Sequence, residues 1–389
     1  MCAAVSVLEQ TVSGHGPIRV MVVDDSAVAR GLMGRWLAEE PDIEVVASLR
    51  TGREAVEWLA RGNADVAVLD IDMPELDGLS ALPLMLARNR DLVVIMASTL
   101  TRENAEISLQ ALSLGAADYV AKPEARRGGI SGGTFRRDLI DKVRMVGGRR
   151  HRFARWRPAE LRSARRHDGQ DPIVPAPPLA ARPPPVVLRS PSRHMPRGIV
   201  IGASTGGPQA LLALLPQLSA VCERVPVLVV QHMPPTFTTI FAEHIARATG
   251  RPAREAVEGE PILPGVVYLA PGGRHMRVTM RAGRPAIALD DGAPINFCKP
   301  AVDPLFQTAG DIWGAACLAV VLTGMGSDGT AGARLIAAAG GTVIAQDEAT
   351  SAVWGMPGSA VQAGLCSAVL PIEAIPAEIA RLSGVGGAR

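Results

Sequence analysis

Two separate runs of short apolar segments, each alternating with helical segments, constrain the fold of this 389-residue chain more than any other feature. Near-continuous apolar strands that alternate with helices indicate a parallel, doubly wound sheet with helices on both faces. A helix predicted over residues 135–146 completes the first run. Its predicted strands cover residues 18–23, 43–48, 65–70, 92–98 and 118–121.

The second run begins near Pro196 and predicts another mainly parallel α/β domain, interrupted by a β-hairpin over residues 275–291. Between the runs, residues 149–166 hold eight arginines against one acid, and residues 172–196 hold nine of the 31 prolines. Such a stretch cannot bury a core and is typical of a linker. We therefore predict one domain over 18–146, a linker over 147–196 and a second domain over 197–384.

The bulk composition fits a chain with two real cores, because 48% of the residues are hydrophobic and 20% are charged. The net charge of +2 excludes no class of partner. The N-terminal residues lack the pattern of a signal peptide, and no apolar run is long enough to span a bilayer, so we expect a cytoplasmic protein without membrane insertion. Five scattered cysteines without a C-x-x-C pair argue against a disulfide framework and a structural zinc site.

Acidic and hydroxyl side chains gather at the ends of the predicted strands of the first domain. In a doubly wound sheet the carboxyl ends of the strands share one edge, where ligands bind. Carboxylates packed closely together repel, and a divalent cation relieves that repulsion. Oxygen ligands suit Mg²⁺, which favours phosphoryl transfer onto a neighbouring carboxylate such as Asp70. The residues at this edge are Asp24, Asp25, Asp70, Asp72, Ser98, Thr99 and Lys122.

Four motifs in this order, "VVDDS", "LDIDMPELDG", "MAST" and "YVAKP", resemble the receiver domain of two-component response regulators, a flavodoxin-like (βα)5 fold. The resemblance implies Mg²⁺ as the cofactor of phosphorylation and a chemotaxis histidine kinase as the phosphodonor. It implies these roles: phospho-acceptor Asp70, acidic metal ligands Asp24, Asp25, Asp70 and Asp72, switch hydroxyl Ser98, switch aromatic Tyr119 and phosphate-sensing Lys122.

Three polar residues follow strands of the second domain. Ser204 lies on the glycine-rich turn "GASTGG" after the strand that starts this domain, and His232 ends the next strand. Asp328 follows a third strand, within "TGMGSDG". A serine, a histidine and an aspartate that meet at one sheet edge predict a nucleophile, a base and an orienting acid. The glycine-rich turn before Asp328 offers backbone N–H groups to an oxyanion.

Two alternative sites fit less well. A dinucleotide site needs an acid near the end of the second strand, where this chain has Gln231 and His232, and "GASTGG" does not match G-x-G-x-x-G. The α/β-hydrolase order is serine, acid, histidine, whereas here His232 precedes Asp328. His244, inside a predicted helix, and His275, at the hairpin, are expected to be surface or packing residues.

The motifs "IGASTGGPQALLALL", "VVQHMP", "YLAPGG", "VLTGMGSDG" and "IAQDEATSAVWGMPGSAV" resemble the catalytic domain of the chemotaxis protein-glutamate methylesterases. The resemblance implies hydrolysis of glutamate γ-methyl esters on chemoreceptors, and deamidation of receptor glutamines, without a cofactor for ester hydrolysis. It also implies the backbone N–H of Met325 as an oxyanion donor, and Thr205 is a candidate supporting residue. The chain departs from the family pattern at Lys299 and Ala301, where Arg and Ser are common, and in its long linker.

Two other functions stay open from the sequence. In the first, the same esterase chemistry acts on a different methylated protein. In the second, the chain is a regulator without catalysis: its arginine-rich stretch, 149–166, binds an acidic partner or nucleic acid, and its second domain is a binding module. Nucleic acid is not expected as a partner, because the sequence has no helix-turn-helix or zinc signature.

Overall fold

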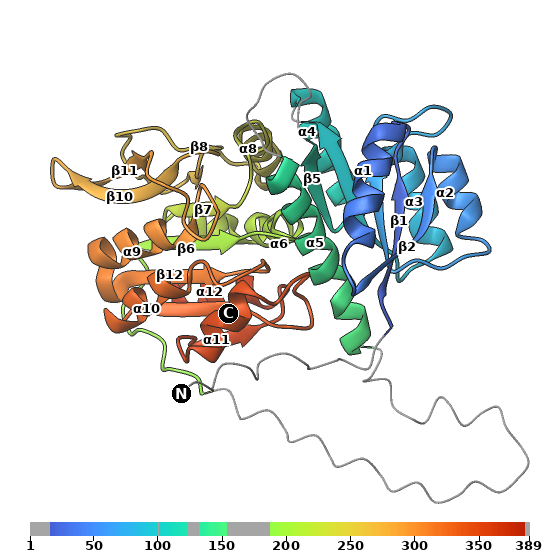
Figure 1. Ribbon diagram of the computed structural model, residues 1–389. Helices are drawn as coiled ribbons and strands as arrows, with labels where there is room; N and C mark the ends of the chain where they lie inside the picture. The colour runs from blue at the N-terminus through green and yellow to red at the C-terminus, as the bar shows by residue number, and fades with distance from the viewer. Residues whose placement is uncertain (1–15, 100, 123–131, 154–186, 386–389) are drawn as a thin grey trace, which may run out of the picture.

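The structure, a computed structural model, describes residues 16–99, 101–122, 132–153 and 187–385 (Figure 1). Its first unit is a five-stranded parallel sheet in the order β2-β1-β3-β4-β5, which confirms the predicted doubly wound fold. The strands are β1 (Ile18–Val23), β2 (Ile43–Leu49), β3 (Val66–Asp70), β4 (Val93–Thr99) and β5 (Asp118–Lys122). The helices are α1 (Ala27–Ala38), α2 (Gly52–Trp58), α3 (Gly78–Arg88), α4 (Arg102–Ser113) and α5 (Gly132–Phe153).

Both faces of this sheet are buried, as the near-continuous apolar strands predict. Along β1, Met21 and Val23 join the core on one face, whereas Val20 and Val22 join the core on the other. Local sequence also sets where four helices of this unit begin, because a polar side chain caps each of these N-termini by accepting a backbone N–H. These caps are Ser26 for α1, Thr51 for α2, Asp77 for α3 and Thr101 for α4.

The second unit is a seven-stranded sheet in the order β14-β13-β12-β6-β7-β9-β8, parallel throughout. An antiparallel hairpin of β10 (His275–Arg281) and β11 (Arg284–Asp290) interrupts it, as predicted. The strands of the large sheet are β6 (Gly198–Ala203), β7 (Val227–Gln231), β8 (Ala253–Glu255), β9 (Val267–Leu269), β12 (Cys317–Val321), β13 (Thr342–Gln346) and β14 (Ala368–Leu370). The helices are α6 (Gly207–Leu214), α7 (Ser219–Cys222), α8 (Pro235–Thr249), α9 (Val302–Trp313), α10 (Thr330–Ala338), α11 (Met356–Gln362) and α12 (Ile375–Leu382), with 3-10 turns η3 (Leu215–Leu218) and η4 (Gly314–Ala316).

Strand β6 lies between β12 and β7, so the strand order reverses there. In open α/β sheets ligands bind at such a reversal, outside the carboxyl ends of the strands. Strand β1, between β2 and β3, occupies the same position in the first unit. The fold therefore places one candidate site at the end of β6 and another at the end of β1.

The two units contact each other through helices, with α4 packed against α6 and α8 (Figure 1). Most of the predicted linker lies outside the described residues. Its first part continues α5 to Phe153, and its last part, from residue 187, lies along the second unit. There Ser192 donates its hydroxyl to the Ala315 carbonyl at 2.7 Å, and its backbone N–H to Thr342 Oγ1 at 2.9 Å.

Candidate functional site

Three aspartates converge at the carboxyl edge of the first sheet. Asp24 and Asp25 follow β1 and Asp70 ends β3, and one carboxylate oxygen of each lies within 4.8 Å of the others. Lys122 forms ion pairs at 2.6 Å with both Asp24 and Asp70. Burial nevertheless raises the pKa of Asp70 to about 6, against the opposing effect of Lys122. Three carboxylates with a single paired lysine give this site an excess of negative charge.

This oxygen-rich, partly compensated group fits a hard divalent cation such as Mg²⁺. Asp72 is not part of the group, although the sequence predicts it as a ligand. Its exposed carboxylate accepts a hydrogen bond at 3.0 Å from Asn104, which also donates to Thr99 at 2.7 Å. Strand β3 ends at Asp70 and the chain turns outward, so the side chain two residues later points to α4 instead.

The remaining predicted residues of this edge lie on the neighbouring strands. Ser98 is buried on β4, next to the strand that carries Asp70. Tyr119 is buried on β5, and its ring stacks on Phe237 of α8 in the second unit, with ring centroids 4.3 Å apart and planes 5° apart. The predicted switch aromatic thus contacts the other unit directly.

Ser204 lies on a tight turn between β6 and α6. Gly206 adopts a φ of 74° at the N-cap of α6, a conformation that glycine reaches without strain. The Ser204 carbonyl accepts hydrogen bonds from the Gly207 N–H at 2.7 Å and from Gln231 Nε2 at 2.9 Å. A Cβ on Gly207 would lie 2.0 Å from the Gln231 side-chain oxygen, so this turn needs glycine at that position as well.

His232 follows β7 beside this turn, and its backbone N–H donates to the Ala203 carbonyl at 3.1 Å. Its Nε2 lies 2.8 Å from Oδ2 of Asp328. Nδ1 of the imidazole therefore does not face Asp328 and can bind another partner. The structure brings all three predicted residues to one sheet edge, although within the described residues no hydrogen bond joins the Ser204 hydroxyl to His232.

The Asp328 carboxylate is buried, with a side chain 2% exposed, and is held by backbone N–H groups. Val302 and Asp303 donate to it at 2.7 Å and 3.0 Å, and Gly329 donates at 2.9 Å. Burial alone would raise the pKa of Asp328, but its bond to His232 and these amides hold that pKa below its usual value. Asp328 thus stays ionised beside the imidazole.

The pKa of His232 is raised, to about 9. Burial alone would lower it, but hydrogen bonding to the side chains of Asp328 and Cys298 and their charges outweigh that effect. At neutral pH the imidazole is therefore mainly protonated in this arrangement. Cys298 is half-buried beside His232, whereas the thiols of Cys222, Cys317 and Cys366 are buried, and no sequence pattern marks Cys298 as part of this site.

The turn after β12 approaches Ser204 closely. A Cβ on Gly324 would lie 2.8 Å from the Ser204 Cβ. Met325 is the next residue in the chain, so its backbone lies close to the turn that carries Ser204. In the described part of the chain the Met325 N–H has no hydrogen-bond partner, which leaves it free to bind an oxyanion. Thr205 is buried, and its carbonyl accepts a hydrogen bond from the Thr323 hydroxyl at 2.8 Å, which fixes the turn.

Two further residues organise this edge and were not assigned a role from the sequence. Gln231 is buried and its Nε2 also approaches the His232 carbonyl at 3.3 Å, so it ties the serine turn to the histidine. His275 is buried at the start of β10, and both of its ring nitrogens lie within hydrogen-bond distance of backbone groups. Their signals were a polar residue at a buried strand end and a histidine at a hairpin, which sequence reasoning alone does not separate from packing.

The first unit lies against the edge that carries Ser204. The guanidinium of Arg137 on α5 lies 5.4 Å from the ring centroid of Phe297, the residue before Cys298. Val353 belongs to the same apolar cluster as the α5 side of the first sheet, and Met325 packs against that cluster. The first unit therefore contacts residues that lie close to Ser204 and His232.

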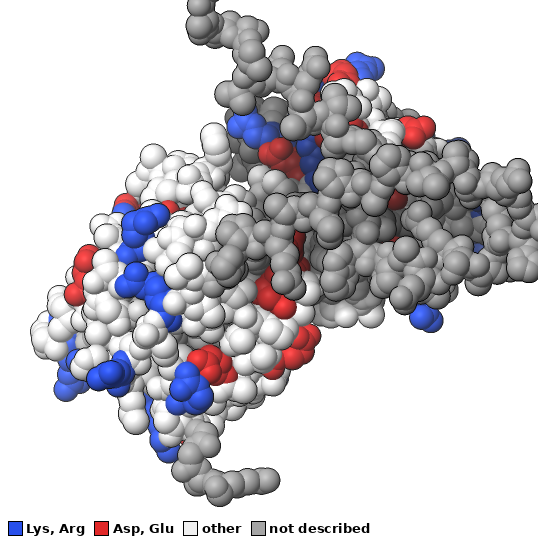
Figure 2. All heavy atoms as spheres, turned by 90° about the horizontal axis from the view of Figure 1, so that it is seen from below, with Lys and Arg blue, Asp and Glu red and all other residues white. Residues whose placement is uncertain are grey.

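Of the predicted arginine-rich stretch, 149–166, only residues 149–153 at the end of α5 are among the described residues. On the face drawn in Figure 2, the basic and acidic side chains of the described residues are interspersed. Mixed charge of this kind is typical of a solvated surface, not of a nucleic-acid footprint. No described helix is both long and apolar enough to cross a membrane.

Comparison with known proteins gives two family matches. The CheB methylesterase family matches residues 199–379, and the response regulator receiver domain matches residues 20–129. A protein-glutamate methylesterase/protein-glutamine glutaminase of group 2 operon from Bradyrhizobium diazoefficiens is 59% identical over 94% of each chain. A protein-glutamate methylesterase/protein-glutamine glutaminase 1 from Rhodospirillum rubrum is 50% identical over 94% of this chain and 95% of its own. The Thermotoga maritima CheB methylesterase catalytic domain is 41% identical, with a TM-score of 0.47, and covers 49% of this chain and 100% of its own.

The raised pKa of His232 predicts its titration in the folded protein. Histidine-selective NMR should give a midpoint near pH 9, and Asp328→Asn should move it to lower pH by removing the main raising partner. Since the folded-state pKa exceeds 6.5, protonation of His232 stabilises the fold below that pH, and this contribution disappears as the pH rises through about 9. A wild-type midpoint near 6.5 would contradict the predicted coupling.

Proposed function

The chain belongs to the CheB methylesterase family, and from that premise we propose that Ser204, His232 and Asp328 hydrolyse glutamate γ-methyl esters on chemoreceptors. One observation carries this proposal. The turn with Ser204 lies at the same edge of the sheet as His232 and Asp328, whose Nε2 and Oδ2 atoms are 2.8 Å apart. The same site deamidates receptor glutamines, because esters and primary amides pass through similar tetrahedral intermediates.

The first half-reaction forms an acyl-enzyme. Ser204 Oγ attacks the ester carbonyl and transfers its proton to His232, which must be neutral for this step. Since Nε2 faces Asp328, Nδ1 is the nitrogen that accepts the proton. When the tetrahedral intermediate collapses, the C–O bond to the methoxy group breaks and His232 returns the proton, releasing methanol.

Charge that develops on the carbonyl oxygen needs donors already in place. The free N–H of Met325 supports its assignment as the main donor, since it adjoins the turn that approaches the Ser204 Cβ at 2.8 Å. Thr205 supports the site by holding the turn. Loss of one such donor typically slows the reaction about 10²–10³-fold.

The second half-reaction regenerates the serine. A water molecule gives one proton to His232 and attacks the acyl carbonyl, and the bond to Ser204 Oγ then breaks as His232 returns the proton to it. The products are the glutamate carboxyl group and free Ser204. With a glutamine substrate, ammonia leaves in place of methanol.

Phosphorylation of Asp70 controls this activity in our proposal, with a chemotaxis histidine kinase as the phosphodonor. Asp24, Asp25 and Asp70 would hold Mg²⁺, which would neutralise charge on the transferred phosphoryl group. Lys122, paired with Asp70 at 2.6 Å, is positioned to bind the phosphate, and Ser98 lies on the adjacent strand.

The route from Asp70 to the second unit passes through the unit interface. Tyr119 stacks on Phe237, and α8 begins three residues after His232. At the same interface Gln209 of α6 donates to the carbonyls of Leu112 and Ala116 at 2.8 Å and 2.5 Å. Phosphorylation needs only to favour a second arrangement of these contacts to change access to Ser204.

Ser204→Ala tests the nucleophile. Methanol release from methylated receptor membranes should fall about a thousandfold or more, because the remaining groups cannot form the acyl-enzyme. Ser113→Ala, at an exposed position on α4, is the matched control and should keep the wild-type rate. Near-normal methanol release by Ser204→Ala would exclude this mechanism.

Asp70→Asn tests the phosphorylation control. Asparagine keeps the shape of the side chain but cannot form an acyl phosphate, so the ratio of rates with and without acetyl phosphate should fall to unity. Asp72→Asn should still be stimulated, since Asp72 lies outside the group formed by Asp24, Asp25 and Asp70. Stimulation that survives in Asp70→Asn would disprove the assignment.

A further inference from the structure

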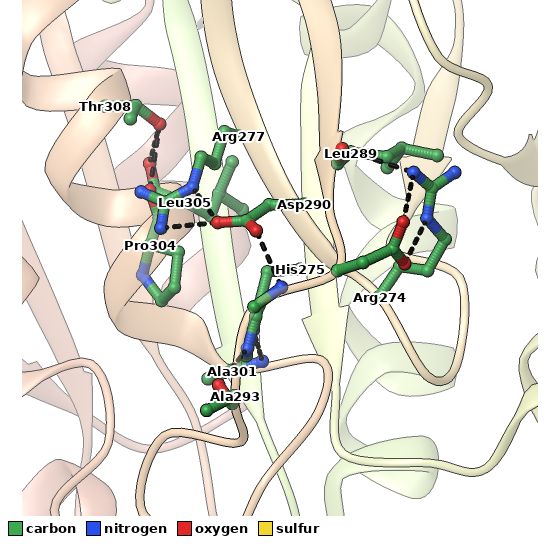
Figure 3. Close-up of polar contacts among 12 residues, drawn as sticks. Arg274, His275, Arg277, Leu289, Asp290, Ala293, Ala301, Pro304, Leu305 and Thr308 are labelled. Carbon is green, nitrogen blue, oxygen red and sulfur yellow. Dashed lines mark hydrogen bonds and ion pairs between the residues drawn. The ribbon is translucent and has the colours of Figure 1, made fainter.

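His275 is a buried histidine whose two ring nitrogens both have backbone partners. It starts β10 with 1% of its surface exposed. Its Nε2 lies 3.0 Å from the Ala293 carbonyl oxygen, and its Nδ1 accepts the Ala301 N–H at 3.1 Å (Figure 3). A carbonyl needs a donor and an N–H needs an acceptor, so the neutral ring with its proton on Nε2 is the form that fits.

Ala301 is the N-cap of α9, and an alanine cannot cap a helix with its side chain. The first N–H groups of a helix have no partner inside the helix and need acceptors from elsewhere. Here the N–H of Ala301 is bound by His275, while the next two, of Val302 and Asp303, are bound by Asp328. The start of α9 therefore has two acceptors supplied by other parts of the fold.

These bonds connect His275 to His232. The Val302 N–H donates at 2.7 Å to Oδ2 of Asp328, the same oxygen that lies 2.8 Å from His232 Nε2. A shift of the first turn of α9 would therefore move or rotate that carboxylate. Because the carboxylate is buried, water cannot replace the backbone N–H donors that such a shift would remove.

We propose that His275 is a positioning residue for ester hydrolysis, which holds the first turn of α9 so that Asp328 orients His232. This inference rests on the proposed function, because it assigns a task within that site. Because His275 is buried, its proposed task is to position other residues and not to bind the substrate. A misplacement of about 1 Å at a remote residue can slow catalysis about 10²-fold, which is the scale of effect expected here.

Two isosteric substitutions separate the two bonds of His275. The oxygen of asparagine occupies the place of Nδ1 and can still accept the Ala301 N–H, whereas the amide nitrogen of glutamine occupies the place of Nε2 and can still donate to Ala293. We expect His275→Gln to lower kcat about 10- to 100-fold with little change in KM, and His275→Asn to keep kcat within a few-fold of wild type.

Methanol release from methylated receptor membranes measures these constants on the full chain. The low-field NMR resonance of the proton between His232 and Asp328 gives a second reading, which should shift in His275→Gln and persist in His275→Asn. Equal losses in both variants, or a wild-type kcat in His275→Gln, would overturn the proposal.

A third measurement does not depend on any variant folding. ¹⁵N NMR of the wild-type protein at neutral pH should identify His275 as the neutral ring protonated on Nε2, and any other form would also overturn the proposal. These spectra report on His275 even if wild-type protein releases no methanol, a result that would instead contradict the proposed function.

Discussion

The hydrogen bonds of the buried Asp328 carboxylate hold the second site together. Asp328 is 2% exposed and accepts three backbone N–H groups as well as facing His232. A buried charge is tolerated only when it is paired and hydrogen-bonded, and removing one partner of such a pair costs about 3–5 kcal/mol. Asp328 therefore joins the turn after β12, the start of α9 and the end of β7 into one rigid arrangement. Its charge also explains why the pKa of the buried His232 is raised and not lowered.

The raised pKa of His232 bears on how the enzyme is regulated. A base that is mainly protonated at neutral pH cannot accept the proton of Ser204, and in this docked arrangement no bond joins the two side chains among the described residues. The first unit meanwhile packs against Met325 and contacts Phe297. These contacts support the proposal that the docked first unit restrains the enzyme, and the Tyr119–Phe237 stack joins the unit that carries Asp70 to α8.

Periodicity and strand ends predicted much of this arrangement from the sequence. The alternation of apolar strands with helices gave both parallel sheets, and parallel strands place Ser204, His232 and Asp328 at one edge. The family resemblance is confirmed by the comparisons, whereas the roles of the individual residues stay predictions. Strands β8 and β14 were missed because each has only three, partly exposed residues.

The remaining features depend on contacts that no local pattern encodes. Which nitrogen of His232 faces Asp328 is decided by packing across 96 residues of sequence. Asp72 occupies a predicted ligand position, but the turn after β3 directs it to Asn104. His275 gains its significance only because Ala301, 26 residues later, has an N–H that needs an acceptor.

We propose that Ser204 is a nucleophile that His232 activates and that the docked first unit restrains. Covalent labelling with a fluorophosphonate, located by mass spectrometry of the full chain, tests this most directly. We expect one labelled serine, Ser204, and faster labelling in the presence of Mg²⁺ and acetyl phosphate. Labelling at another serine, or none at Ser204 under either condition, would contradict it.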